Sequence, residues 1–478
     1  MPPPQPSPPP PPPREIQLDA CILGGGIAGL WTLAHLRRLR YRAALIELHT
    51  LGGGPDGQTL ASQGIIHGGI KYALSGAAAA ASRAIAAMPE IWQRSLRDAA
   101  DANDLPGAVL PLRPFLDPAR AVLSQTQLLW TTPGVASRLA GAAASKVIRT
   151  PVERLAVGQR PPPFDHAAGI DVYRVAEPVL SVGEIIRALI RLAGPRSILA
   201  LRSGAADLLR IHPLHPGASS GGATGTTGDA SRGIASITID GRQGGGTGGG
   251  IDTAAAHASS PITIHAARYI FAAGAGNAAL IARTFADAPA GQEPPRMQRR
   301  ALHMVMLRAP DLPAIFGHCV GLSDKPRVTI TTARDRTGRA VWYVGGQLAE
   351  LGVSRSPAEQ VAAAKQELAA CLPWLNLASL APEWATWRVD RAEGLTPRGD
   401  RPDEPVIAAI GNVISAWPTK LAFAPLVAER IAAMMPPVVT GAADPAGPLS
   451  GLLRATDTDL DSLIAAYPWD RSEVPWTP

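Results

Sequence analysis

The sequence predicts an α/β protein with one parallel and one antiparallel sheet. At the start of the chain, an apolar run at residues 16–23 ends at Gly24, apolar residues recur at helical spacing over 30–39, and a second apolar run covers 43–48. This strand–helix–strand order is typical of a parallel sheet. Alternating segments, notably 328–332 and 340–344, indicate antiparallel strands. The predicted fold class is therefore α/β, a Rossmann-type domain with an inserted antiparallel α+β domain.

Further elements follow from the same patterns. We expect an amphipathic helix at residues 181–192, strands at 197–201 and 267–272, and a helix that begins with Pro418 in its first turn and ends at Met435. Residues 217–230 and 241–250 are rich in glycine, so we expect them to be the loops of a hairpin around a strand at 234–239.

These elements divide the chain into discontinuous parts. Residues 2–13 are almost pure proline, which predicts a disordered tail, with a docking motif as the alternative. The Rossmann-type domain is expected at 15–90, 176–295 (with a Gly-rich insert at 216–260) and 389–436. The second domain is expected at 91–175 and 296–388. A tail at 1–14 precedes both domains, and a C-terminal extension at 437–478 follows them.

Composition excludes several classes of protein. The 478 residues are 46% hydrophobic and 18% charged with a net charge of +6, and the basic residues are scattered, so no nucleic-acid partner is indicated. Three cysteines show no ligand spacing, which argues against a disulfide framework and a metal site. No apolar run reaches the roughly 18 residues of a membrane span, and no signal peptide is apparent. We therefore expect a cytoplasmic protein without an integral membrane segment.

The first strand is followed by a glycine motif that indicates a dinucleotide site. Residues 24–29 match GxGxxG: Gly24 permits the tight turn, Gly26 lets the backbone approach a diphosphate, and Gly29 lets the helix pack on the strand. The amides of the helix start, at Ile27 and Ala28, would then face the phosphates. A carboxylate that could bind a ribose diol, Glu47, ends the second strand.

The segment after Glu47 suggests which dinucleotide is bound. Residues 57–72, GQTLASQGIIHGGIKY, resemble the segment that follows the βαβ unit in the D-amino-acid-oxidase-type (DAO) superfamily of flavoproteins, including glycerol-3-phosphate dehydrogenases and 2-hydroxyglutarate oxidases. The resemblance implies FAD as cofactor. It also implies that this segment passes the diphosphate and meets the flavin ring, with contacts from Thr59, Ser62, Gln63 and Gly64.

Two later segments are similar to that superfamily in the same order. Residues 269–277 resemble its second FAD contact, which implies roles for Ala273 and Gly274. Residues 390–397, followed by 411–413 and 417–421, resemble the third, which implies that Gly394 and the backbone amides of Thr419, Lys420 and Leu421 close the flavin site. These amides would stabilise the anion of the reduced ring.

The resemblance is incomplete at two places. Glycerol-3-phosphate dehydrogenases typically carry Ser-Lys where this chain has Gln63-Gly64, and they continue into a helical C-terminal domain for which this chain leaves too few residues. The Gln63-Gly64 pair is more similar to the hydroxy-acid and amino-acid branches of the superfamily.

Four residues are the candidates for the chemistry. The motif places His67 at the flavin edge, where it would act as base or as a structural imidazole. An arginine fork suits a substrate anion, and Arg300 with Tyr343 would project from the second sheet. Lys420 lies at the closing turn. Lys71 and Tyr72, His303, and Arg388 and Arg391 are weaker candidates.

The predicted function is that of an FAD-dependent oxidoreductase, a dehydrogenase or oxidase that transfers a hydride to flavin N5. Its substrate would be a small 2-hydroxy acid, polyol phosphate or amino acid, and its electron acceptor oxygen, a quinone or a carrier protein. An NAD-linked dehydrogenase and a non-catalytic flavin-binding sensor or scaffold are the alternatives. A disulfide reductase is excluded, because the sequence lacks a cysteine pair for it.

Overall fold

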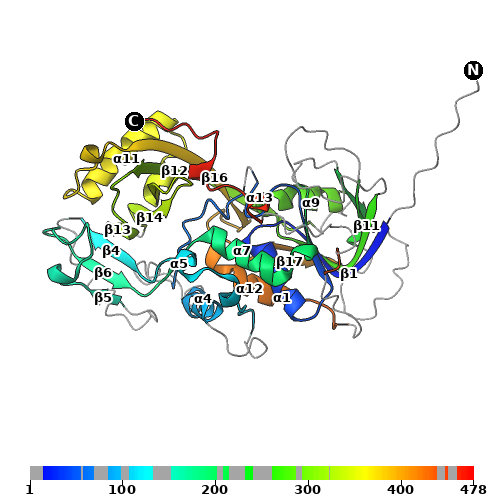
Figure 1. The fold of residues 1–478 in the computed structure, drawn as a ribbon. Coiled ribbons are helices and arrows are strands. Elements are labelled where there is room, and N and C mark those ends of the chain that lie inside the picture. The colour runs from blue at the N-terminus through cyan, green and yellow to red at the C-terminus, as the bar shows by residue number, and fades with distance from the viewer. Residues whose placement is uncertain are drawn as a thin grey trace, which may run out of the picture.

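A computed structural model shows two sheets that lie in two lobes of an elongated molecule (Figure 1). The structure describes residues 14–54, 57–68, 84–97, 107–132, 152–201, 208–214, 232–240, 261–286, 293–321, 323, 325–438, 447–449 and 460–478. Most of the proline tail, much of the Gly-rich insert, and Lys71 and Tyr72 lie outside these residues.

The first sheet has five parallel strands at its centre, in the order β18-β11-β1-β2-β8. Antiparallel strands extend it, β17 beside β18 and the pair β9–β10 beside β11. Parallel strands must be buried on both faces, which explains their nearly continuous apolar sequences. The strands are β1 (Arg14–Leu23), β2 (Ala43–Glu47), β8 (Ile198–Ala200), β9 (Leu209–Pro213), β10 (Ile234–Ile239), β11 (Ile262–Phe271), β17 (Val406–Ile410) and β18 (Val413–Trp417).

Helices cover one face of this sheet, and α9 with the β9–β10 pair covers the other. Successive residues of β1 alternate between these layers: Ile22 packs with α1, α7 and α12, whereas Cys21 and Leu23 pack with α9. The helices of this lobe are α1 (Ile27–Arg38), α4 (Met88–Leu96), α5 (Pro118–Ala121), α7 (Val182–Ala193), α9 (Asn277–Thr284), α12 (Ala424–Ala432) and α13 (Leu460–Leu463). Strands β3 (Val122–Ser124) and β7 (Val179–Leu180) form a separate antiparallel pair.

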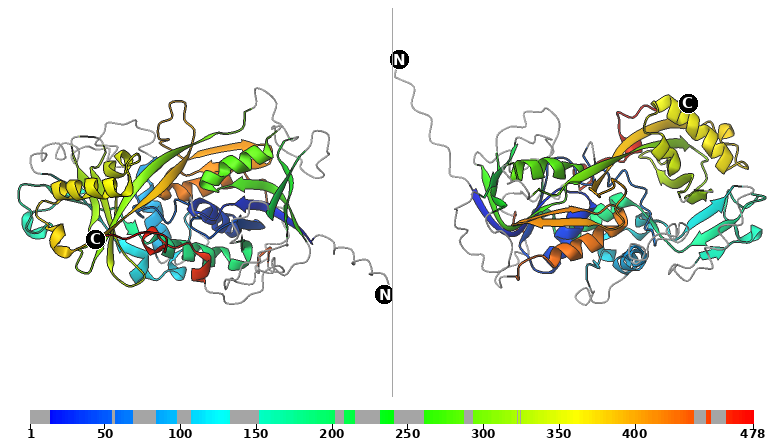
Figure 2. Two further views of the ribbon diagram at one scale, coloured as in Figure 1. Left: turned by 90° about the horizontal axis from the view of Figure 1, so that it is seen from above. Right: turned by 180° about the vertical axis from the view of Figure 1, so that it is seen from behind.

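The second sheet has the order β16-β12-β15-β14-β13-β4-β6-β5, and all of its pairs are antiparallel except β13–β4. Its strands are β4 (Gln127–Thr131), β5 (Val152–Arg154), β6 (Val172–Val175), β12 (Met297–Ala309), β13 (Phe316–Val320), β14 (Val328–Arg334), β15 (Ala340–Gly345) and β16 (Glu383–Gly394). Two helices pack on it, α10 (Gln347–Leu351) and α11 (Pro357–Cys371), the second of which begins with a capping box between Ser356 and Glu359. The long strands β12 and β16 extend toward the first lobe (Figure 2).

The end of the chain connects the two lobes. Ile464 forms a bridge with Leu51, beside the first sheet, and Thr477 forms a bridge with Trp384 at the start of β16. Between them, Tyr467 stacks on Trp469 with ring centroids 4.6 Å apart. The C-terminal segment, residues 460–478, therefore crosses from one lobe to the other, which its sequence did not predict.

Most of the predicted elements are confirmed, with small shifts at their ends. The helix expected at 418–435 is an exception, because Thr419 adopts a left-handed φ of 58° and Lys420 is extended. A short 3-10 turn, Leu421–Phe423, then leads into α12, so Pro418 lies before the helix and not in its first turn. Among the described residues, no helix has the length and apolar character needed to cross a membrane.

Candidate functional site

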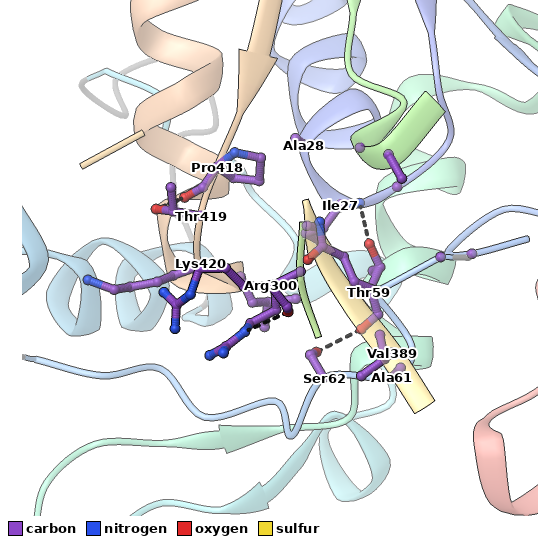
Figure 3. A pocket seen from close by; sticks show the side chains of 18 of the residues that line it. Ile27, Ala28, Thr59, Ala61, Ser62, Arg300, Val389, Pro418, Thr419 and Lys420 are labelled. Atoms are coloured by element: carbon purple, nitrogen blue, oxygen red, sulfur yellow. Dashed lines mark hydrogen bonds between the residues drawn. The ribbon is translucent and has the colours of Figure 1, made fainter. Parts of the chain in front are cut away.

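A cavity of about 1060 Å³ lies between the two sheets. Its walls include the turn after β1, residues 57–67, the start of α9, the turn at 418–422, and parts of β12, β14 and β16. Figure 3 shows Ile27 and Thr59 on one side of this pocket and Thr419, Lys420 and Arg300 on the other. The cavity thus brings together segments that are far apart in the sequence.

The glycine turn is packed so tightly that side chains are excluded. Gly24 has a φ of +116°, and a Cβ added there would lie 2.5 Å from the Cα of Ala273. A Cβ on Gly29 would lie 1.9 Å from the carbonyl oxygen of Gly24. The helix α1 therefore starts directly against the tip of β1, and Gly26 and Ala28 line the cavity while Gly29 packs behind it.

The start of α1 is suited to an anion. The helix has no acidic residue in its first turn, so its partial positive charge is not offset locally. The Ile27 amide donates a hydrogen bond to the Thr59 hydroxyl at 3.2 Å. This turn and the adjoining space have the backbone amides and the room that a dinucleotide diphosphate would need.

Glu47 also lines this part of the cavity. Its carboxylate accepts hydrogen bonds from the amides of Gly25, at 2.6 Å, and His49, at 2.9 Å. These bonds hold the carboxylate at the mouth of the glycine turn, and its remaining lone pairs can accept from a ribose diol.

The polar side chains of residues 59–64 mainly hold the segment in place. Ser62 donates to the carbonyl of Thr59 at 2.7 Å. The amide of Gln63 donates to the carbonyls of both Thr329 and Tyr343 at 2.9 Å, so this side chain links the segment to β14 and β15. A Cβ on Gly64 would lie 2.1 Å from the Leu180 carbonyl oxygen. All four residues line the cavity.

The turns after β11 and β18 close the same end of the cavity. The Ala273 amide donates to the side chain of Asn277 at 2.8 Å, and Gly274 has a φ of +58°. The Lys420 amide donates to the Pro418 carbonyl at 2.6 Å, so this amide is used within the turn and not aimed at a ligand as expected. Thr419, Lys420 and Leu421 nevertheless line the cavity.

Two histidines lie face to face on the cavity wall. The rings of His67 and His318 stack with centroids 5.4 Å apart, and His318 Nδ1 lies 2.7 Å from the Thr329 hydroxyl. The fully buried carboxylate of Glu177 lies 3.8 Å from His67 Nδ1. Glu177 also accepts hydrogen bonds from the Gly68 amide and the Gln127 side chain. This carboxylate can orient His67 and stabilise its protonated form.

A network of charged side chains lies on the second sheet's part of the wall. Glu350 Oε2 is 2.6 Å from Lys325 Nζ, and Glu350 Oε1 is 3.3 Å from Arg391 and 3.7 Å from Arg300. Arg300 also lies 3.3 Å from the buried Glu393. We call these residues, together with Arg401, which is 3.8 Å from Glu393, the cation network.

Three predicted residues do not line the cavity. Besides Gly29, these are Gly394, where a Cβ would lie 2.5 Å from Val406, and Tyr343. Tyr343 is fully buried, its hydroxyl donates to the Ala61 carbonyl at 3.0 Å, and its ring packs edge-on against Trp469. His303 also points elsewhere, with Nδ1 2.9 Å from the Gly352 carbonyl oxygen.

Sequence reasoning missed His318, Glu177, Lys325, Glu350 and Arg401. None of them belongs to a local motif. Only the alternation along β13 offers a signal, because His318 faces the cavity while the next residue, Cys319, packs in the core of the second lobe.

Comparisons with known proteins show which proteins this chain is similar to. A family model described as FAD-dependent oxidoreductase (DAO) matches residues 19–157. The chain is 41% identical over 425 residues to the probable FAD-dependent oxidoreductase PA4991 of Pseudomonas aeruginosa, covering 88% of this chain and 92% of that protein. The crystal structure of PA4991 aligns with a TM-score of 0.64 at 35% identity, covering 96% of this chain and 98% of that one.

More distant solved structures share the fold. Glycine oxidase from Geobacillus kaustophilus has a TM-score of 0.54 at 16% identity, covering 92% of this chain and all of that one. Iminodiacetate oxidase from Chelativorans sp. BNC1 has a TM-score of 0.55 at 14% identity, covering 90% and 98% of the two chains.

Proposed function

Because the chain belongs to the DAO family of FAD-dependent oxidoreductases, we propose that it oxidises a small α-amino or 2-hydroxy acid in the cavity between its two sheets. Family membership decides between the alternatives that the sequence left open: the cofactor is FAD and not NAD, and the protein is an enzyme and not a scaffold. The observation that carries the substrate class is that one cavity joins the glycine turn, the stacked histidines and the cation network.

FAD, when bound, supplies the acceptor for a hydride and its two electrons. Gly24, Gly26 and the start of α1 would hold its diphosphate, and Glu47 its ribose. The turn at Thr419 and Lys420 would lie beside the flavin, where the lysine charge favours an anionic ring.

The substrate's carboxylate would bind Arg300. This guanidinium lines the cavity with its side chain 22% exposed, and its fork matches two carboxylate oxygens. Because Arg300 comes from β12 and His67 from residues 57–68, an acid bound between them is held by both lobes. Such positioning aligns the reacting carbon.

The proton that leaves the substrate's amino or hydroxyl group would go to His67. Loss of this proton to the imidazole, together with the hydride that FAD would take up, would convert the substrate to an imino or oxo acid. The carboxylate of Glu177, 3.8 Å away, would stabilise the imidazolium that results. His318 holds the ring of His67 by stacking.

The test is anaerobic mixing of the FAD-loaded chain with amino and 2-hydroxy acids of both configurations, followed by the loss of oxidised-flavin absorbance. We expect His67→Gln to slow reduction by at least about 100-fold, since a general base contributes that much, without changing FAD content. His166, 92% exposed on its side chain, supplies the control His166→Gln, which should react normally.

Two outcomes would count against this function. If none of these acids reduces the flavin, the substrate class is wrong. If His67→Gln reduces as fast as the wild type, His67 is not the base. Once a substrate has reduced the flavin, its reoxidation by oxygen, by a quinone analogue or by a dye that replaces a carrier protein would identify the class of electron acceptor.

A further inference from the structure

The cation network holds more positive than negative charge. Among the residues that the structure describes, two carboxylates, Glu350 and Glu393, form ion pairs with the four basic residues of the network, Lys325, Arg300, Arg391 and Arg401. The four basic residues therefore exceed the two acidic ones by two charges. Both carboxylates are already shared between several cations, so they leave this excess uncompensated.

The wider lining of the cavity has the same sign. Among the described residues, seven arginines and lysines line it against four aspartates and glutamates. Two of the acidic residues, Asp400 and Asp403, are exposed and therefore screened by water and salt, as is Lys325. The less exposed arginines of the network, Arg300, Arg391 and Arg401, still outnumber its two carboxylates.

The arrangement is costly for folding alone. Arg300 and Arg391 lie directly opposite each other on β12 and β16, and like charges in that position destabilise a sheet. Burial, and then the charges of Arg300 and Arg401, lower the pKa of Arg391 to about 10. Unfavourable charge placement of this kind is typical of binding sites, where a ligand relieves it.

We propose that Arg391 and Lys325 bind a second anionic group of the substrate, so that the enzyme is specific for doubly anionic molecules. This inference rests on the proposed function, in which Arg300 binds the first carboxylate. Two negative charges on the ligand match the excess of two positive charges in the network. The class is therefore an amino- or hydroxy-dicarboxylate, with a phosphate ester as the other source of two charges.

Glu350 sets the threshold for this specificity. Its carboxylate occupies the centre of the network and is held by Lys325, Arg391 and Arg300 when the ligand is absent. A single negative charge on the ligand gains little against this internal competitor, whereas a doubly charged ligand engages all three cations.

The experiment first measures binding without turnover, by calorimetry on the FAD-loaded chain. The probes are malonate and glutarate, each against its monoamide, which has the same shape and one charge fewer. We expect each dicarboxylate to bind at least tenfold more tightly than its monoamide, and this ratio to fall as salt rises. Equal affinities for the two members of each pair would overturn the proposal.

Variants then assign the effect to residues. Arg391→Gln should abolish the preference for the dicarboxylate while FAD content is unchanged. Glu350→Gln, which removes the internal competitor, should tighten binding of the monoamides and so lower the preference. The control Arg334→Gln changes an exposed arginine at the end of β14 and should leave the ratio as it is. A preference that survives Arg391→Gln would place the second anion elsewhere and overturn the assignment.

A separate measurement keeps this inference apart from the proposed function. Anaerobic flavin reduction is compared for aspartate with asparagine, glutamate with glutamine, and sn-glycerol 3-phosphate with glycerol. Reduction by both members of the amino-acid pairs at equal rates refutes the specificity and leaves the function standing. No reduction, together with tight malonate binding, refutes the function alone. Reduction only by the phosphate ester refutes the proposed substrate class of amino and 2-hydroxy acids and identifies a phosphate as the source of the two charges.

Discussion

Gly29→Ala should weaken FAD binding, although Gly29 does not line the cavity. The residue packs behind the glycine turn, and the added Cβ would lie 1.9 Å from the Gly24 carbonyl oxygen. An ordinary contact needs at least 3.4 Å, so α1 must move away from the tip of β1 by roughly 1.5 Å. The amides of Gly26 and Ala28 move with it, and these line the place for the diphosphate.

The expected loss follows from the cost of overpacking. Inserted methyl groups in tight packing cost about 1–3 kcal/mol, and the short distance here argues for the upper end, which corresponds to roughly 100-fold in FAD affinity. Flavin fluorescence quenching measures the dissociation constant, and the visible spectrum measures the FAD content. Gly158→Ala is the matched control, because a Cβ there has nothing within 4 Å. A Gly29→Ala protein that binds FAD within threefold of the wild type would refute this account.

Three further predictions concern stability. Burial acts to raise the pKa of Glu350, but Lys325, Arg391 and Arg300 outweigh it and hold that pKa below the usual 4.5. The ionised carboxylate therefore stabilises the fold fully above about pH 4.5, and this contribution is lost as the pH falls through the pKa of the folded state. Glu350→Gln should make the free energy of unfolding, measured with urea at a series of pH values, fall less steeply at acid pH, and an unchanged slope would exclude the effect. Trp469→Ala removes a buried ring and should cost about 3–5 kcal/mol in the free energy of unfolding, whereas a loss under 1 kcal/mol would mean that the C-terminal segment does not tie the lobes together. Gln63→Leu leaves two carbonyls without their donor and should cost about 1–3 kcal/mol, measured by the same unfolding, with no loss contradicting the link.

The parts of the site that the sequence could predict are local. The turn at Gly24, the acid at Glu47 and the start of α1 follow from chemistry within one βαβ unit, where glycine spacing and strand ends decide the geometry. The second lobe's contribution depends on pairing between β12 and β16, whose residues are about ninety positions apart in the sequence. No pattern in either strand alone indicates that Arg300 and Arg391 will meet.

The wrong placement of Tyr343 has a specific cause. Tyr343 pairs with Met306 and belongs to the same apolar cluster as Met304, which lines the cavity. Trp469 covers this part of the sheet, so the tyrosine packs against the C-terminal segment and not against a ligand. The prediction failed because the segment that covers the face lies more than a hundred residues away. His303 differs, because it neighbours Met304 on the strand and its side chain takes the opposite face.

The same contacts explain why residues 59–64 can serve both lobes. The Tyr343 hydroxyl holds the Ala61 carbonyl, and Gln63 holds the carbonyls of Thr329 and Tyr343, so this segment of the nucleotide-binding lobe is fastened to the second sheet at three points. Trp469 then presses on Tyr343 from the other side. Because the hydroxyl of Thr59, at the start of the segment, accepts a hydrogen bond from the first amide of α1, a movement of the second sheet would also displace the glycine turn. Hydrogen bonds that are buried or partly buried therefore connect the glycine turn to the second sheet, which carries Arg300 and Arg391 on β12 and β16.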